Sequence, residues 1–333
     1  MTILVTGGAG YIGSHTVLYL KDQGEEVVIL DDFSNGHRRA ILDSPYYEGT
    51  IHDEDILDRV FTENKIDAVI HFAASSLVGE SVINPLFYYE NNVVGTIQLL
   101  KKMVEYKVRN IVFSSTAATY GEPQSIPIKE EDPTEPTNPY GETKLSIEKL
   151  LKWNDQAYGV KSVCLRYFNA AGADPKGRIG EEHNPETHLI PIVLQVALKQ
   201  REYLKVFGDD YNTEDGTCIR DYIHVMDLAQ AHYLAMKRIR DLEESKIYNL
   251  GNGQGFSVKE VLETCRKVTG EYIEAKVSPR RTGDPAVLIA SSDKAKQELG
   301  WKPQYTELET MVKHAWQWYL KHPNGFEVDL LNE

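Results

Sequence analysis

Cysteine is scarce in this sequence. Only Cys164, Cys218 and Cys265 occur among 333 residues, and they lie far apart without the paired spacing of a metal site. This scarcity argues against a disulfide framework and against a zinc cluster built on thiolates. We therefore expect reduced thiols, a cytoplasmic location and no metal site.

Long apolar runs and an excess of positive charge are also missing. The longest apolar stretch, residues 189–198, contains Pro191 and Gln195 and is too short to span a bilayer. No basic leader precedes residues 1–5, which are typical of a first strand rather than a signal peptide. The formal net charge of −14 would repel polyanions. We therefore expect neither a nucleic-acid nor a membrane partner.

Short apolar runs alternate with helical patterns through the first half of the chain. The expected strands are residues 3–5, 27–30, 68–70, 111–113 and 163–165, and the expected helices lie near 11–23, 53–63, 91–106 and 140–157. Strands that are apolar throughout indicate a parallel sheet covered on both faces. This order predicts an α/β fold with a doubly wound, Rossmann-type sheet, whose ligands lie outside the carboxyl ends of the strands.

The composition changes after Asn169 to segments rich in glycine, proline and charge. Shorter elements are expected near residues 257–268, 291–299 and 306–320. We predict two domains: residues 1–169 bind a dinucleotide, and residues 170–333 form a smaller, C-terminal substrate domain. Residues 219–240 are expected to return to the first domain.

A glycine-rich turn directly follows the first expected strand. Gly7, Gly8, Gly10 and Gly13 satisfy both the GxxGxxG and the GxGxxG spacing. Glycine is needed where a tight turn, a close approach to pyrophosphate and close helix packing exclude a side chain. The helix that follows offers free N–H groups and a positive dipole end to phosphates. We therefore predict dinucleotide binding rather than a merely structural turn.

A carboxylate at the end of the second strand supports this prediction. Asp31, eighteen residues after Gly13, can accept hydrogen bonds from an adenosine ribose. Its charge would repel a 2′-phosphate, which favours NAD over NADP. His37, Arg38 and Arg39 could hold such a phosphate, but they come after the usual position and are expected in a solvated loop.

A tyrosine and a lysine stand four residues apart at an expected helix start. Tyr140 and Lys144 therefore share one helix face. The same interval recurs at residues 233 and 237 and at 272 and 276. Only the first pair follows an Asn-Pro helix start and a strand that runs into Thr116. We predict that Tyr140 is catalytic.

As a base near neutral pH, Tyr140 needs an unusually low pKa. A free phenol has a pKa of about 10, and lowering it by about 3 corresponds to about 4 kcal/mol. We expect the Lys144 ammonium and a positive nicotinamide ring to supply this depression. The Thr116 hydroxyl is expected to share the proton and to hold the substrate oxygen.

Taken together, these motifs resemble the extended short-chain dehydrogenase/reductase family, and within it the UDP-sugar 4-epimerases. The likeness covers essentially the whole chain and includes residues 71–74, 88–92, 166–169, 213–217 and 220–225. The resemblance implies an NAD-dependent isomerase that interconverts UDP-glucose and UDP-galactose through a transient 4-keto sugar. It also implies a homodimer formed by the helices near 91–106 and 140–157, although the sequence alone could equally bury these helices within one chain.

The resemblance also implies individual contacts. The expected cofactor contacts are Gly7, Gly10, Tyr11, Ile12, Gly13, Asp31, Asn35, Phe72, Ala73, Asn91, Tyr140, Lys144 and Tyr167. The expected substrate contacts are Thr116, Tyr140, Asn169, Phe207, Arg220, Arg281, Asp284 and Leu288. The two arginines would hold the UDP diphosphate with charge-assisted bonds, whereas their alternative role is surface ion pairing.

Several positions depart from the family's pattern. Thr116 stands where serine is common, Thr50 where an aspartate often holds adenine, and Ser76 where a lysine often lies beside the cofactor. His188 replaces a common asparagine. Leu288 is smaller than the tyrosine of strict relatives, and we hypothesise that N-acetylated UDP-sugars also enter.

Three other functions share parts of this pattern. A nucleotide-sugar 4,6-dehydratase or decarboxylase would use the same first oxidation. Related dehydratases carry Asp-Glu directly after the catalytic threonine, where this chain has Ala117 and Ala118. A non-catalytic NAD-binding scaffold on the same fold would need no tyrosine, lysine and hydroxyl set.

Overall fold

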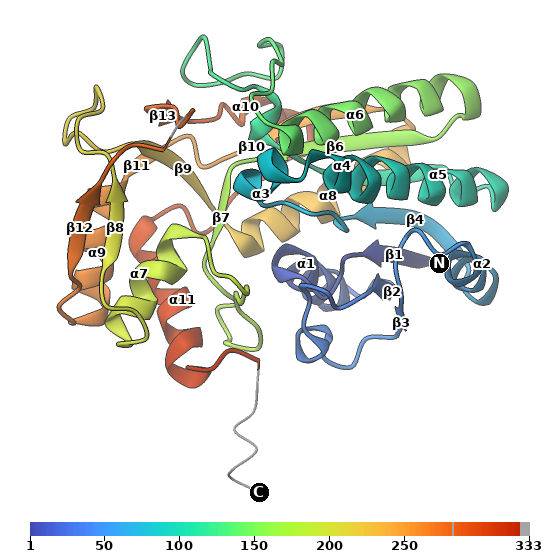
Figure 1. The fold of residues 1–333 in the computed structure, drawn as a ribbon. Coiled ribbons are helices and arrows are strands. Elements are labelled where there is room, and N and C mark those ends of the chain that lie inside the picture. Colours follow the sequence, from blue (N-terminus) through green and yellow to red (C-terminus); the bar gives the residue numbers. More distant parts are fainter. Residues whose placement is uncertain (282, 327–333) are drawn as a thin grey trace, which may run out of the picture.

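The computed structural model describes residues 1–281 and 283–326, and it is built on a seven-stranded sheet (Figure 1). The strand order is β10-β6-β5-β4-β1-β2-β3, and all neighbours are parallel. The strands are β1 (Thr2–Thr6), β2 (Glu26–Asp31), β3 (Tyr46–Glu48), β4 (Ile66–His71), β5 (Asn110–Thr116), β6 (Lys161–Tyr167) and β10 (Lys246–Leu250). The five predicted strands are confirmed, and β3 and β10 extend the sheet at its two edges.

Helices cover both faces of this sheet, as the doubly wound prediction requires. One face is covered by α1 (Tyr11–Asp22) and α8 (Val225–Leu242), and the other by α2 (Glu54–Glu63), α5 (Gly95–Glu105) and α6 (Pro139–Tyr158). Alternate residues of each strand enter the two cores, since Ile3 packs on the first face and Leu4 on the second. The helix predicted near 91–106 is divided, because a π-helical turn over Tyr89–Val94 precedes α5.

A smaller group of elements gathers on the other side of the molecule in Figure 1. It contains β7 (Asn169–Ala171), α7 (Leu189–Ala197), β8 (Leu204–Phe207), β9 (Ile219–His224), β11 (Gly255–Ser257), α9 (Val258–Thr269), β12 (Ala275–Ser278), β13 (Val287–Leu288) and α11 (Leu308–Lys321). Strand β9 pairs with β7, β11 and β13, and β8 pairs with β12. Helices α7, α9 and α11 share one apolar core beneath these strands.

The chain crosses between the two groups more than once. Within residues 219–240, β9 belongs to the smaller sheet, whereas α8 covers the large sheet. Strand β10 then returns to the edge of the large sheet, and α10 (Asp293–Glu298) packs beside it. The division into domains at residue 169 stays a prediction, and its last residues, 327–333, lie outside the described part.

Strand register joins the two groups at one place. Thr116, the last residue of β5, is in register with Tyr167, the last residue of β6. After Phe168 alone, the chain enters β7, where Asn169 is in register with Tyr222 of β9. Two residues before Tyr222, Arg220 pairs with Leu288. Thr116 is therefore connected to Arg220 by the pairing of β5 with β6, the short chain link at Phe168, and the pairing of β7 with β9.

The described helices also bear on the expected partners. Within residues 1–281 and 283–326, no helix combines the length and the apolar character that crossing a membrane requires. All three cysteines are buried, and each is a free thiol.

Candidate active site

The glycine turn connects β1 to the N-terminus of α1. Gly7 has a φ of +72°, which favours glycine, and a Cβ there would lie 2.6 Å from the backbone nitrogen of Ala73. A Cβ at Gly13 would lie 2.1 Å from the Gly7 carbonyl oxygen. Helix α1 begins after Gly10 with no side-chain cap and no acidic residue in its first turn, which includes Tyr11 and Ile12. Its N–H groups therefore suit a dinucleotide pyrophosphate.

Asp31 pins this turn to the end of β2. One carboxylate oxygen accepts the Ala9 N–H at 2.8 Å, and the other accepts the Phe33 N–H at 2.9 Å. Burial raises the pKa of Asp31, and these two hydrogen bonds oppose the rise. Asp31 thus orients the glycine turn, a role that the sequence analysis did not assign. In the loop that follows, Asn35 is exposed.

The basic residues of that loop have their own partners. Arg38 pairs with Glu48 at 2.6 Å and lies 4.3 Å from the centre of the Phe33 ring. This arrangement fits the solvated loop that was expected. His37 lies 3.3 Å from the carbonyl oxygen of Glu182.

The other predicted cofactor residues lie at the carboxyl ends of the strands. The N–H groups of Phe72 and Ala73 both donate to the carbonyl oxygen of Thr6, which brings them against the end of β1. The Asn91 amide donates to the Ser75 hydroxyl at 3.0 Å. The Tyr167 hydroxyl hydrogen-bonds the Ser114 hydroxyl at the ends of β6 and β5.

A second amide supports this edge and was missed by the sequence analysis. Asn92 is fully buried, and its amide oxygen accepts the Ser75 N–H at 2.8 Å. Its amide nitrogen donates to the Ser75 carbonyl oxygen at 3.0 Å and to the Thr143 hydroxyl at 3.1 Å. Asn92 therefore ties the loop after β4 to α6. Its position in the 88–92 motif was the only available signal.

The three predicted catalytic residues come together beside these groups. Asn138 caps the N-terminus of α6, and its side chain accepts the Gly141 N–H at 2.9 Å. One turn later, Lys144 Nζ donates to the Ser114 carbonyl oxygen at 2.9 Å and lies 6.0 Å from the centre of the Tyr140 ring. The Thr116 side chain lies close enough to Tyr140 to lower the pKa of the phenol. A phenol, an amine and a hydroxyl therefore meet at the edge predicted for the ligand.

The expected depression of the Tyr140 pKa is not produced by the chain's own groups. Burial raises the pKa of Tyr140, and the Thr116 side chain opposes this rise only in part. Burial also lowers the pKa of Lys144 to about 7, although the Glu148 carboxylate opposes that fall. Lys144 is therefore only partly charged near neutral pH. The expectation that Lys144 and a nicotinamide ring together lower the phenol's pKa stays a prediction, and burial of both side chains opposes the part assigned to Lys144.

A buried ion pair lies one helical turn beyond Lys144 and was also missed. Arg166 donates to both oxygens of Glu148, with Nε at 2.9 Å from Oε1 and Nη2 at 2.6 Å from Oε2. Glu148 also accepts the Ser115 hydroxyl at 2.5 Å. Arg166 donates in addition to the Tyr120 hydroxyl at 2.9 Å. The pair thereby holds α6 against β5 and β6 underneath the catalytic residues.

The predicted diphosphate ligands form a separate, charged group. Arg220 Nη2 lies 2.5 Å from Asp284 Oδ1, and Arg281 Nε lies 3.8 Å from Asp284 Oδ2. The Arg281 guanidinium lies 4.4 Å from the centre of the Phe207 ring, and the strand pairing places Leu288 beside Arg220. The structure thus unites five predicted substrate residues. Thr282, within this segment, lies outside the described residues.

The departures from the family pattern have different surroundings. The His188 ring hydrogen-bonds Glu181, and the Thr50 hydroxyl accepts the His52 N–H at 3.4 Å. Ser76 is exposed, and so is Asn169 at the start of β7.

Comparison with known proteins adds a family to this geometry. Residues 4–315 match the family model described as GDP-mannose 4,6 dehydratase. The UDP-glucose 4-epimerase of Halalkalibacterium halodurans is 66% identical over 329 residues, which cover 99% of this chain and 98% of that protein. A crystal structure of a UDP-glucose 4-epimerase matches with a TM-score of 0.97 and 57% identity, over 98% of this chain and 100% of the other. The UDP-glucose 4-epimerase of Bifidobacterium longum, crystallised with NAD+ and UDP, matches with a TM-score of 0.93 and 43% identity. This match covers 98% of this chain and 100% of the other.

Proposed function

Because the chain belongs to the UDP-glucose 4-epimerase family of extended short-chain dehydrogenases/reductases, we propose that it interconverts UDP-glucose and UDP-galactose with tightly bound NAD. The observation that carries this proposal is the meeting of Tyr140, Lys144 and Thr116 at the sheet edge. Paired strands connect that edge to the arginines that suit a diphosphate. Identity of 66% over nearly the whole chain supports the same reaction.

The residues at the sheet edge fit NAD. The uncapped N-terminus of α1 can receive the pyrophosphate, and the Asp31 carboxylate suits an adenosine ribose better than a phosphorylated one. Bound NAD would supply a reversible hydride acceptor for C4 of the sugar. The chain's own residues must therefore manage the proton and hold the UDP.

Tyr140 and its neighbours carry out the proton transfer. Tyr140 removes the proton of the sugar's 4-hydroxyl and gives it back once C4 has been inverted. Thr116 lies close to the phenol and holds the same sugar oxygen. Lys144 lies on the same helix face, fixed by the Ser114 carbonyl oxygen. Because C4 regains its hydride and the oxygen regains its proton in each turnover, the reaction has no net redox change and consumes no second redox substrate.

The arginines have a different task. The transient 4-keto sugar must present its opposite face, so it can keep few lasting contacts of its own. Arg220 and Arg281 would hold the diphosphate with charge-assisted hydrogen bonds while the sugar turns. The Asp284 carboxylate pairs with both guanidinium groups, and this shared partner keeps the two arginines close together.

The rival functions receive less support. The family model that matches this chain is described by a dehydratase, but elimination of water needs an acid and a base after the oxidation. Ala117 and Ala118, at the positions after Thr116, offer neither. A scaffold would leave the meeting of Tyr140, Lys144 and Thr116 without a purpose.

One experiment tests the reaction and cofactor retention together. Purified protein is incubated with UDP-galactose and no added NAD, and the products are separated by chromatography. We expect UDP-glucose. Accumulation of a 4-keto-6-deoxy sugar would instead indicate the dehydratase, and bound NAD without turnover of any UDP-sugar would indicate the scaffold.

We also propose that N-acetylated UDP-sugars are substrates. The half-buried Leu288 lies beside Arg220 in the strand pairing, so its size bears on the space next to the diphosphate group. A leucine there leaves more room than the tyrosine of strict relatives. Incubation with UDP-N-acetylglucosamine should give UDP-N-acetylgalactosamine, and absence of any conversion would remove this proposal.

Finally, we propose a homodimer, in keeping with the resemblance to dimeric relatives. Apolar side chains are exposed on α3 (Val78–Ile83) and α4 (Pro85–Tyr88), which precede α5 in the chain, with Ile83 85% and Leu86 81% exposed, and Trp153 is exposed on α6. Sedimentation should therefore show a dimer that Ile83→Asp with Leu86→Asp converts to a monomer. Val277→Asp, at an exposed position on β12, should leave the dimer intact.

The cytoplasmic location is likewise a proposal, supported by the three free thiols.

A further inference from the structure

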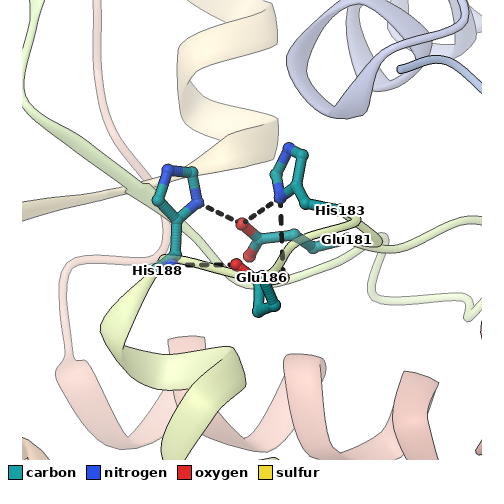
Figure 2. A group of neighbouring side chains, drawn as sticks. All are labelled: Glu181, His183, Glu186 and His188. Carbon is teal, nitrogen blue, oxygen red and sulfur yellow. Dashed lines mark hydrogen bonds and ion pairs between the residues drawn. The ribbon is translucent and has the colours of Figure 1, made fainter. Parts of the chain in front are cut away.

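A compact group of two histidines and two glutamates lies between β7 and α7, outside the proposed reaction site. Glu181, His183, Glu186 and His188 occupy one eight-residue segment of the chain. Figure 2 shows the two imidazole rings on either side of the Glu181 carboxylate. We propose that these four side chains form a binding site for a divalent transition-metal ion of the Zn²⁺ class.

The distances suit four ligands around a single ion. One ligand atom from each residue can be chosen so that all four lie within 4.8 Å of one another. His183 Nδ1 lies 3.4 Å from Glu181 Oε1 and 3.5 Å from Glu186 Oε2. Tetrahedral zinc, with bonds of about 2.0–2.2 Å, places its ligand atoms roughly 3.4 Å apart. The ion would replace the direct hydrogen bond between His188 and Glu181 with two bonds to the metal.

The group also contains polar atoms without a hydrogen-bond partner. The Glu186 side chain is only 2% exposed, and among the described residues nothing hydrogen-bonds its Oε2. Its Oε1 accepts the N–H groups of Thr187 and His188, both at 2.8 Å, and these bonds aim Oε2 at His183. His183 Nδ1 likewise makes no hydrogen bond within the described part of the chain. A buried carboxylate oxygen in this state is costly, and a metal ion would satisfy it.

The donor types select among metals. Imidazole nitrogens and carboxylate oxygens together suit Zn²⁺ and its transition-metal neighbours, whereas Mg²⁺ prefers oxygen ligands alone. Two carboxylates and two neutral imidazoles also balance the charge of a divalent ion. The backbone N–H groups that bind Glu186 Oε1 provide the outer support that fixes a ligand's orientation.

The surroundings point to a structural role for this ion. The His183 ring packs edge-to-face on Tyr11 of the glycine turn, with ring centres 6.0 Å apart. The neighbouring Glu182 accepts the Phe326 N–H at 2.5 Å and lies beside His37. A metal at this segment would therefore join the glycine turn, the loop after β2 and the end of the described chain. It would stabilise the protein without touching the Tyr140 group.

The alternative for the same four residues is a metal-free network in which protonated rings pair with carboxylates. Calorimetric titration of the full-length protein, after dialysis against a chelator, separates the two. We expect one Zn²⁺ per chain and no binding of Mg²⁺. Glu186→Gln retains the side chain's shape and one backbone acceptor, and it should weaken zinc binding at least about tenfold. If Glu186→Gln does not fold, His183→Gln replaces it under the same criterion.

A matched control uses another histidine contact in this chain. His224 Nε2 lies 3.0 Å from His314 Nδ1, but no described carboxylate lies within ion-pair distance of either ring. His314→Ala should therefore bind zinc as the wild type does. The thermal midpoint should rise with Zn²⁺ in the wild type and in His314→Ala, but not in Glu186→Gln.

Three results would overturn the proposal: no zinc binding by the wild type, unchanged binding in both Glu186→Gln and His183→Gln, or an equal loss in His314→Ala. None of these measurements uses UDP-sugar turnover. A failure here would leave the proposed epimerase function as it stands.

Discussion

The catalytic end and the diphosphate end of the site are built on opposite electrostatic principles. Tyr140 and Lys144 are governed by burial, which raises the pKa of the phenol and lowers that of the amine to about 7. Arg220 and Arg281 are governed instead by pairing, because the Asp284 carboxylate lies beside both guanidinium groups. The difference fits the proposed reaction, in which a proton moves at one end and a dianionic group is held at the other.

The largest effect should come from removing the phenol hydroxyl. Tyr140→Phe keeps the ring but loses the proton acceptor, so we expect kcat to fall about 10²- to 10⁴-fold while KM changes little. Tyr233→Phe is a matched control, because Tyr233 and Lys237 share the four-residue interval on α8. Steady-state kinetics with UDP-galactose measures both variants. A Tyr140→Phe variant with wild-type turnover would remove the distinction between the two ends.

Burial of Lys144 should be visible as a dependence of stability on pH. Its pKa is about 7 in the folded chain and about 10.4 when unfolded, so between these values the unfolded state binds more protons. The free energy of unfolding contributed by this group therefore rises with pH above 7. Lys144→Met lacks the rise, and its stability relative to the wild type should fall by about 2 kcal/mol between pH 7 and 9.

Urea denaturation at pH 6, 7, 8 and 9 would measure this difference. Lys237→Met provides the control, because Lys237 is exposed on α8 and its variant should show no such trend. Parallel stability curves for Lys144→Met and the wild type would show that burial does not govern the amine.

The diphosphate end should lose affinity rather than turnover. A hydrogen bond to a charged group is worth about 1.5–3 kcal/mol, so Arg220→Met should weaken UDP binding about 10- to 100-fold with kcat within about threefold. Arg240→Met is the control, since Arg240 is also ion-paired but contacts Glu25 and Asp67 elsewhere. Calorimetry with UDP gives the affinities. A fall in kcat without a loss of UDP affinity would assign Arg220 to the chemistry instead.

The smallest effect should come from changing Leu288, the residue beside Arg220 that borders the proposed sugar site. Leu288→Tyr should lower kcat/KM for UDP-N-acetylglucosamine about tenfold more than for UDP-galactose, because the added ring occupies the space for the acetyl group. Leu288→Met, which conserves volume, should change the two substrates equally. Competition between the two substrates measures the ratio directly. An equal loss for both in Leu288→Tyr would indicate that this residue does not select the sugar.

The large sheet was more predictable than its edges. Strands such as Ile66–His71 and Asn110–Thr116 lie inside a parallel sheet, and each contains a short apolar run that predicts a strand. Tyr46–Glu48 and Lys246–Leu250 are edge strands with polar residues among the apolar ones, and no such run marks them. The π-helical turn over Tyr89–Val94 was hidden because its apolar spacing resembles that of an ordinary helix.

Local spacing predicted the residues that share a turn or a helix face, but not the pairs that folding creates. Tyr140 and Lys144 stand one turn apart, whereas Glu148 and Arg166 meet only when β6 packs beside α6. Spacing also shows which groups are neighbours but not how deeply they are buried, and burial raises the pKa of Tyr140 in the folded chain. The expectation of no metal site considered cysteine spacing and did not weigh histidine with glutamate.

The single residue between β6 and β7 has a mechanical consequence. Phe168 alone separates β6, which ends opposite Thr116, from β7. Strand β7 pairs with β9, the strand that contains Arg220. Lengthening or shortening this joint by one residue would turn Asn169 to the opposite face of its strand. The distance between Tyr140 and Arg220 is thus set by paired strands and a one-residue link rather than by a long loop. In the proposed reaction, the anchored diphosphate therefore stays at a constant distance from the base while the sugar rotates.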